Sequence, residues 1–244
     1  MSNFISMPFS IMDISIVVPA YNEERRIVPT LEKICSYFSK KGVHFEVLVV
    51  DDGSADSTVH TVLKFQKAQP EVRLLQHSSN KGKGAAVRTG ILNAQGKLVL
   101  FSDSDLSTPI EEFEKLSAAI CQGYDIAIGS RRLPESVIPV SQPLHRRISG
   151  TVFPFLVRLI VMPGFRDTQC GFKLFTRNVA QDIFSRQKLD GFAFDVEILY
   201  LAKKLGYRVK EVPVTWINSP LSSVSIISAS FKMFRDLLFI RFRI

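Results

Sequence analysis

The sequence has few cysteines and lacks a long apolar run. Its three cysteines, Cys35, Cys121 and Cys170, are an odd number without the short spacing of metal-binding motifs, which disfavours a disulfide-stapled secreted domain and a zinc site. We therefore expect free thiols in a reducing compartment. No apolar segment reaches the roughly 18 residues that a membrane-spanning helix requires, so the sequence predicts no such span.

The chain also lacks internal repeats and low-complexity tracts. It contains neither the Walker phosphate-binding pattern nor Gly-x-Gly-x-x-Gly, which excludes the usual P-loop and dinucleotide-binding interpretations. Residues 1–12 have a short apolar stretch without a preceding basic region. They predict an N-terminal extension and not a signal peptide.

The chain is basic and rich enough in apolar residues to fold. At 244 residues, with 46% hydrophobic content, it fits one large domain with a packed core. Its formal net charge of +8 favours anionic partners such as nucleic acid, anionic lipid head groups or phosphorylated substrates. No nucleic-acid motif or aromatic stacking platform accompanies the charge, so we expect no nucleic-acid partner.

Apolar runs alternate with helix-like segments through the first half of the chain. The expected strands are 13–19, 45–51, 72–77, 97–102 and 126–130, and the expected helices are 24–40, 57–69, 83–94 and 110–122. Continuous apolar runs are typical of parallel strands that are covered on both faces. The pattern predicts an α/β fold with a mainly parallel twisted sheet flanked by helices.

Three of these strands end in polar clusters. They are Pro19-Ala20-Tyr21-Asn22-Glu23, Asp51-Asp52-Gly53-Ser54 and Ser102-Asp103-Ser104-Asp105. Open parallel sheets bind ligands at the carboxyl ends of their strands, so one site could collect all three clusters. Turn formation and helix capping account for residues such as Asn22 and Asp56, but they do not explain polar and acidic clusters at three strand ends.

Asp103 and Asp105 stand one residue apart, so their side chains leave an extended chain on the same side. Their charges repel, and a divalent metal would remove the repulsion and act as a Lewis acid for an anionic leaving group. Solvated turn residues are the alternative, because Asp-x-Asp alone is a weak motif. The turn Asn80–Gly84, which carries Lys81 and Lys83 before a predicted helix, suits a phosphate or sugar hydroxyls, or is a plain turn.

Two later segments combine bulky apolar residues with arginine or lysine. They are His145–Met162 and Ile226–Ile244. Basic amphipathic helices of this kind can lie in a membrane interface, whereas ordinary core helices with solvated arginines are the alternative. We divide the chain into an extension at 1–12, a main domain at 13–223 with an amphipathic segment at about 144–162, and an amphipathic helix at 224–244.

The strand-end motifs, together with Gly129-Ser130-Arg131, resemble those of the family 2 glycosyltransferases, and more narrowly those of the polyprenyl-phosphate hexosyltransferases. The stretches Arg166–Arg177, Phe192–Glu197 and Arg235–Arg241 look like the dolichyl-phosphate glucosyltransferase branch. The resemblance runs from about Ile14 to the C-terminus. It implies a GT-A type, Rossmann-like nucleotide-sugar domain, with the segment at about 144–162 on the acceptor side.

The resemblance implies roles for individual residues. The donor-binding residues would be Pro19, Ala20, Tyr21, Glu23, Asp51, Asp52, Lys83, Asp103, Ser104 and Asp105. Asp103 and Asp105 would hold Mg²⁺ or Mn²⁺ and form the catalytic set with Arg131, while Arg131 and Arg132 would bind the acceptor phosphate. Asp195 would either orient substrate or serve as a buried structural carboxylate.

The implied reaction is an inverting, metal-dependent transfer of glucose from UDP-glucose to a polyprenyl (dolichyl-type) phosphate, giving a β-linked product. Loss of a nucleoside diphosphate requires charge neutralisation. The acceptor phosphate is already an anion near neutral pH, so it needs positioning by arginine more than a strong base. The implied setting is the cytosolic face of a membrane, that of the endoplasmic reticulum in a eukaryote or the inner membrane in a bacterium.

Three features depart from the resemblance. The segment Ile217–Val224 has no lysine or arginine where relatives carry a loop expected to close on donor phosphates, and position 107 is a serine, which leaves a third metal ligand open. Eukaryotic members of the glucosyl branch usually begin with a membrane-spanning helix, which we do not find, so we expect peripheral attachment. A GDP-mannose donor, another acceptor, or a non-catalytic nucleotide-sugar- or membrane-binding homologue stays open.

Overall fold

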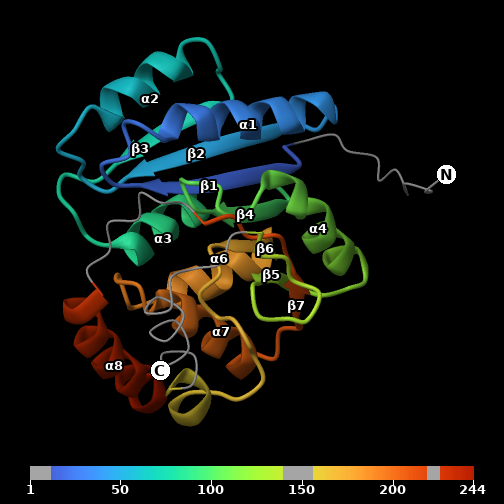
Figure 1. Ribbon diagram of the computed structural model, residues 1–244, viewed down its shortest axis with the longest axis vertical. Coiled ribbons are helices and arrows are strands. Elements are labelled where there is room, and N and C mark those ends of the chain that lie inside the picture. Colours follow the sequence, from blue (N-terminus) through green and yellow to red (C-terminus); the bar gives the residue numbers. More distant parts are fainter. Residues whose placement is uncertain (1–11, 140–155, 219–225) are drawn as a thin grey trace.

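The computed structural model describes residues 12–139, 156–218 and 226–244. Its strands are β1 (Ile14–Ala20), β2 (Phe45–Asp51), β3 (Val72–Gln76), β4 (Leu98–Ser102), β5 (Ile126–Ser130), β6 (Phe172–Thr176) and β7 (Val209–Pro213). Its helices are α1 (Ile27–Lys40), α2 (Thr58–Gln66), α3 (Lys83–Asn93), the short 3₁₀ turn η1 (Ile110–Glu112), α4 (Phe113–Cys121), α6 (Arg177–Arg186), α7 (Phe194–Lys204) and α8 (Ile226–Arg243). Figure 1 shows these elements as a sheet between layers of helices.

The strands form one seven-stranded sheet in the order β3-β2-β1-β4-β6-β5-β7. β1 to β4 pair in parallel, β6 runs antiparallel to both neighbours, and β7 is parallel to β5. The expected α/β fold with a mainly parallel sheet is confirmed. In the register, Ala20 lies opposite Asp51 and Val17 opposite Phe101, so the carboxyl ends of β1, β2 and β4 meet at one edge.

Two apolar clusters fill the faces of the sheet. Ile16 and Val18 of β1 belong to the cluster that α1, α2 and α4 cover, and Val17 belongs to the cluster that α3, α6, α7 and α8 cover. Successive side chains of a strand point to opposite faces, and both faces of β1 are buried, which explains its unbroken apolar run. The core thereby fixes the strand ends that carry the polar clusters.

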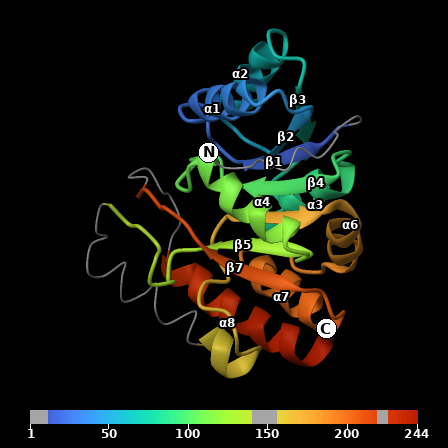
Figure 2. The ribbon, with the colours of Figure 1, turned by 90° about the vertical axis from the view of Figure 1, so that its right-hand side faces the viewer.

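The five predicted strands and four predicted helices of the first half are confirmed within about three residues at each boundary. The last predicted helix is α8, which packs through Leu237 and Ile240, both fully buried, while Phe242 is exposed. Figure 2 shows α8 along α7, at the end of the molecule away from α2. The expected helix at 144–162 and the segment 217–224 lie mostly outside the described residues. Among the residues that the structure describes, no helix is long and apolar enough to cross a membrane.

Candidate active site

The loops that follow β1 and β2 are joined by reciprocal hydrogen bonds at the sheet edge. The amide of Asn22, whose φ is +56°, donates to Ser54 Oγ at 2.9 Å, and the amide of Ala55 donates back to Asn22 Oδ1 at 2.9 Å. This pairing turns the chain sharply after Pro19 and Ala20 at the end of β1. It leaves Tyr21, which directly follows β1, 48% exposed.

Glu23 and Ser104, both expected to bind donor, make structural contacts. Both oxygens of Glu23 accept hydrogen bonds from Arg26, each at 2.6 Å. Ser104 is buried, and its carbonyl accepts a hydrogen bond from Thr30 Oγ1 at 2.6 Å. The structure therefore holds both residues beside the strand ends with partners of their own.

Asp51 and Asp52 are adjacent in sequence but have different surroundings. Asp52 Oδ1 accepts from the amide of Lys81 at 2.9 Å, and Asp52 Oδ2 accepts from the amide of Gly82 at 2.8 Å. His77 Nδ1 also lies 2.7 Å from Asp52 Oδ1. Asp51 Oδ2 accepts from loop amides, whereas its Oδ1 is buried without a hydrogen-bond partner among the described residues. Asp52 thus shapes the glycine-lysine turn, and Asp51 carries the unused acceptor.

The turn approaches residues Leu189–Asp190 closely. A Cβ on Gly84 would lie 2.7 Å from the carbonyl oxygen of Leu189, and Gly82 has a φ of +113°. Real Cβ contacts essentially never fall below 3.0 Å, and only glycine adopts such a φ at little cost. The plain explanation of these glycines, tight packing in a turn, is therefore satisfied, and the turn also delivers Lys83 to the site.

Lys83 and Asp103 form an ion pair at the carboxyl end of β4. Lys83 Nζ lies 2.6 Å from Asp103 Oδ1, and the Asp103 side chain is 35% exposed. Burial lowers the pKa of Lys83, but the charges of Asp103 and Asp195 outweigh it, so the pKa is raised above its usual value. Lys83 is therefore a permanent cation beside the acidic pair.

Asp105 lies in the turn that follows, where its Oδ1 accepts the amide of Ser107 at 2.9 Å and Leu106 has a φ of +45°. Among the described residues no group of three or more histidine, cysteine or acidic side chains could hold a metal ion. Two partly exposed carboxylates nevertheless fit Mg²⁺, which binds proteins through one or two carboxylates and takes its other oxygens from substrate phosphates and water.

A buried ion pair lies beneath this site. Lys173 is fully buried, its Nζ donates to the carbonyl of Cys170 at 2.6 Å and it pairs with the carboxylate of Asp195. Lys83 and Lys173 place their ammonium groups 5.4 and 5.6 Å from the Phe101 ring. Asp195 is only 3% exposed, so the structural interpretation of this carboxylate is the one that its surroundings favour.

Arg131 follows β5 and is clamped by Asp167. Its Nε and Nη2 donate to the two carboxylate oxygens at 2.7 and 2.9 Å, and its guanidinium lies 5.7 Å from the centre of the Trp216 ring. Burial raises the pKa of Asp167, but the charge and hydrogen bonds of Arg131 outweigh it and lower the pKa to about 2. The hydrogen bonds of the Arg131 side chain to the described residues use Nε and Nη2, so its Nη1 keeps donor capacity for a ligand.

Arg132 is the second arginine expected at this point. Its pKa is lowered, first by burial and then by the charges of Arg131 and Arg158, against the opposing effect of Asp167. A cluster of cations therefore extends from Arg131 past Arg132 toward Arg158. Such a cluster gains most from an anion, because each of its members raises the electrostatic potential at the others.

Sequence reasoning missed His77, Asp167 and Lys173 as parts of this arrangement. Asp167 and Lys173 lie within the stretch Arg166–Arg177, which served only to recognise the family branch, and their partners are distant in sequence. His77 directly follows β3, and this strand end carries no acidic cluster that would have drawn attention to it. Polar side chains inside or directly after buried strands were the available signal.

Comparisons with known proteins show the family of this chain. Residues 15–184 match the family model of glycosyl transferase family 2. The chain is 39% identical over 242 residues to a dolichyl-phosphate beta-glucosyltransferase of Drosophila melanogaster, covering 94% of this chain and 74% of the relative. A Saccharomyces cerevisiae protein of the same name is 36% identical, with 93% and 74% covered.

Solved structures share the fold. Mannosyl-3-phosphoglycerate synthase from Rubrobacter xylanophilus superposes with a TM-score of 0.70 at 18% identity, covering 94% of this chain and 72% of that one. Glucosyl-3-phosphoglycerate synthase from Mycobacterium tuberculosis, crystallised with Mn²⁺, UDP and glucosyl-3-phosphoglycerate, gives a TM-score of 0.62 at 19% identity, with 94% and 78% covered. These likenesses confirm the expected GT-A type fold.

Proposed function

This chain belongs to glycosyltransferase family 2 and is a glycosyltransferase, and we propose that it transfers glucose from UDP-glucose to a polyprenyl phosphate of the dolichyl type. The observation that carries the proposal is the pairing of two charged centres at one sheet edge. The acidic pair with Lys83 follows β4, and the clamped Arg131 follows β5. The relatives' shared name favours glucose and dolichyl phosphate over the alternatives.

The donor is assigned to the ends of β1, β2 and β4. The unpaired Asp51 Oδ1 is a buried acceptor, and a buried acceptor without a partner is costly. An N–H of the nucleotide base would satisfy it, with the exposed Tyr21 available to cover the base. Lys83 would shift from Asp103 to the diphosphate, because its charge suits both anions.

Asp103 and Asp105 are assigned to a divalent cation, Mg²⁺ or Mn²⁺. When bound, it would neutralise the charge that develops on the departing diphosphate. The two carboxylates would supply two of its oxygen ligands. Lys83, no longer paired with Asp103, would place a second positive charge at the same phosphates. The carbonyl of Ser107 accepts the amide of Ile217 at 2.7 Å. Ser107 would therefore hold the turn that carries Asp105 in place.

The acceptor phosphate is assigned to Arg131 and Arg132. Asp167 fixes the Arg131 guanidinium by two hydrogen bonds, so little side-chain freedom is lost when Nη1 meets a phosphate. A phosphate monoester is an anion near pH 7 and attacks without a strong base. One displacement at the anomeric carbon inverts the α-linked donor to a β-linked product.

The product and acceptor carry long apolar chains, so the enzyme would work at a membrane surface. We assign it to the cytosolic face, where it would be peripheral and held in part by the amphipathic face of α8. Three apolar residues of α8 are exposed, Phe234, Leu238 and Phe242, and they support contact with a membrane surface.

The test is transfer of radiolabelled sugar into an organic-extractable product by the purified chain with Mn²⁺ or Mg²⁺ and a polyprenyl phosphate. UDP-glucose and GDP-mannose are compared as donors. Metal-dependent lipid label from UDP-glucose alone is the expected result. Label from GDP-mannose alone would contradict the donor, and no lipid label from either donor with a folded, nucleotide-binding protein would contradict the acceptor.

A further inference from the structure

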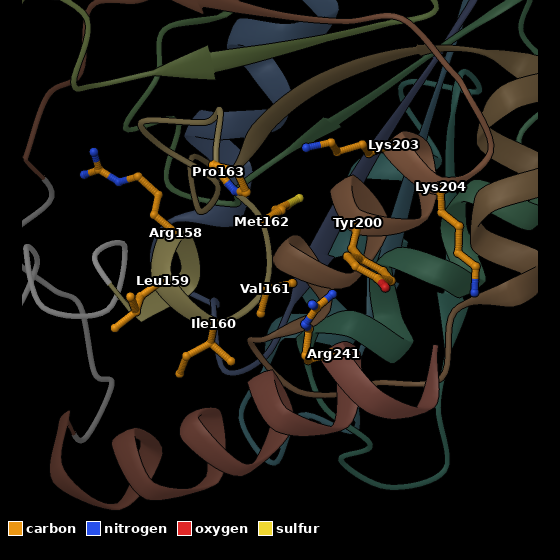
Figure 3. A pocket seen from close by; sticks show the side chains of 10 residues that line it. All are labelled: Arg158, Leu159, Ile160, Val161, Met162, Pro163, Tyr200, Lys203, Lys204 and Arg241. Carbon is orange, nitrogen blue, oxygen red and sulfur yellow. The ribbon is translucent and has the colours of Figure 1, made fainter.

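A pocket of about 430 Å³ lies between the segment 158–163, α7 and α8. Figure 3 shows its walls: the 158–163 segment on one side, Tyr200, Lys203 and Lys204 of α7 on the other, and Arg241 of α8 at its base. Of these residues only Arg158 was met in the candidate active site, as a charge that acts on Arg132. The packing of Leu237 and Ile240 into the core holds α8 against α7, so the pocket has fixed walls.

The pocket is strongly cationic. Arg158, Lys203, Lys204 and Arg241 line it, and no aspartate or glutamate is among its lining residues. The Lys204 ammonium also donates to the main-chain oxygen of Ile244. Tyr200 adds a phenolic side chain within the same wall. Four cations around one hollow suit an anion with several oxygens, such as a phosphate.

Apolar side chains stand exposed beside these charges. Leu159, in the pocket wall, is 70% exposed, and Phe242, which follows Arg241, is 75% exposed. Large exposed apolar residues bordered by lysine and arginine are the pattern of a surface that lies in the headgroup region of a bilayer. A soluble phosphate compound would account for the cations and leave Leu159 and Phe242 without a role.

We propose that this pocket binds the phosphate headgroup of an anionic membrane lipid while Leu159 and Phe242 enter the interface beside it. The proposal deepens the proposed function by naming the surface that faces the membrane. Arg158 acts electrostatically on Arg132, so the pocket neighbours the cations assigned to the acceptor phosphate. Docking here would bring the acceptor site to the plane in which a lipid phosphate lies.

The matched control for this pocket is on α2, which Figures 1 and 2 show at the far end of the molecule. Lys64 and Lys67 are exposed there, as Lys203 and Lys204 are in the pocket. The variants Lys203→Glu/Lys204→Glu and Lys64→Glu/Lys67→Glu change the net charge equally. A difference between them therefore reports position and not total charge.

The experiment measures co-sedimentation of the full chain with vesicles of phosphatidylcholine alone or with about one third phosphatidic acid. We expect the chain to prefer the anionic vesicles, the pocket variant to bind them at least about tenfold more weakly, and the α2 variant to stay within about twofold of the parent. Phe242→Ser should weaken binding to the same vesicles without removing the charge preference.

Equal losses of vesicle binding in the two charge variants, or no loss in either, would overturn the proposal. Full displacement of the chain from vesicles by inorganic phosphate at millimolar concentration would also overturn it. Circular dichroism checks that each variant is folded. Glucosyl transfer in detergent separates the two proposals: failure of transfer by the parent chain contradicts the proposed function and leaves vesicle binding as measured. Retained transfer by the pocket variant in detergent places its defect at the membrane.

Discussion

Gly171 controls where Asp103 stands, and replacing it by alanine tests the proposed donor site. Gly171 precedes β6, and its carbonyl accepts the amide of Asp103 at 3.0 Å. A Cβ added at Gly171 would meet Asp103 Oδ2, Cγ and Oδ1, all at 2.5 Å or less, where real Cβ contacts stay beyond 3.0 Å. The φ of Gly171 is not in the left-handed region, so alanine is excluded by the carboxylate and not by the backbone.

The cost follows from the movement that the added methyl group enforces. The Asp103 carboxylate must shift by about 1 Å, and a misplacement of that size costs about 100-fold in rate. The shift also breaks the 2.6 Å contact with Lys83. The free energy of unfolding should change little. An alanine restricts the unfolded chain, which stabilises the folded state by about 0.4–1 kcal/mol and offsets part of the strain.

The assay is initial-rate glucosyl transfer from UDP-glucose with Mn²⁺, alongside thermal unfolding. We expect kcat/KM for the donor to fall about 100-fold in Gly171→Ala, with a change in Tm of only a few degrees. The matched background is Asp103→Ala, in which the added methyl group has no carboxylate to displace. In that background, Gly171→Ala should lower kcat/KM for the donor by less than about a further threefold. A Gly171→Ala enzyme with near-normal kcat/KM, or a full second loss in the Asp103→Ala background, would refute the reasoning.

Three further predictions concern the acidic pair and the arginine clamp. Asp105→Ala should abolish the Mn²⁺-dependent part of UDP binding measured by calorimetry, and unchanged metal dependence would remove Asp105 from the metal assignment. Arg131→Ala should raise KM for polyprenyl phosphate at least about tenfold more than KM for UDP-glucose, whereas equal changes would contradict an acceptor role. Asp167 is buried and its folded pKa of about 2 lies below the ordinary value of 3.8, so its stabilising contribution is present above about pH 4 and is lost as the pH falls toward 2. Asp167→Asn should therefore lower the free energy of unfolding by about 2 kcal/mol at pH 7. Urea titrations should show that this loss of stability becomes smaller near pH 2. A loss of stability that does not depend on pH would contradict the ion pair.

The parallel half of the sheet was predictable because its signals are local. β1, β2 and β4 are short apolar runs, each followed by polar residues and a helical segment. β6 was not predicted, and Lys173 explains why. A lysine at the second position of a five-residue strand argues against burial, yet Lys173 is fully buried because Asp195, from α7, pairs with it. No sequence pattern joins two residues that meet only through tertiary packing.

The same limit separates Asp51 from Asp52. From the sequence the two aspartates are interchangeable, since both follow the apolar run of β2. The structure distinguishes them because Asp51 is the last residue of β2 and Asp52 has already left the strand, so their carboxylates turn to different neighbours. Asp52 reaches forward to the amides of Lys81 and Gly82 and fixes the turn from which Lys83 extends to Asp103. Asp52 therefore positions Lys83, whereas Asp51 keeps one carboxylate oxygen without a hydrogen bond among the described residues, the oxygen that we propose as an acceptor for the donor base. This division depends on a turn some 30 residues further along the chain, which only the fold brings to Asp52.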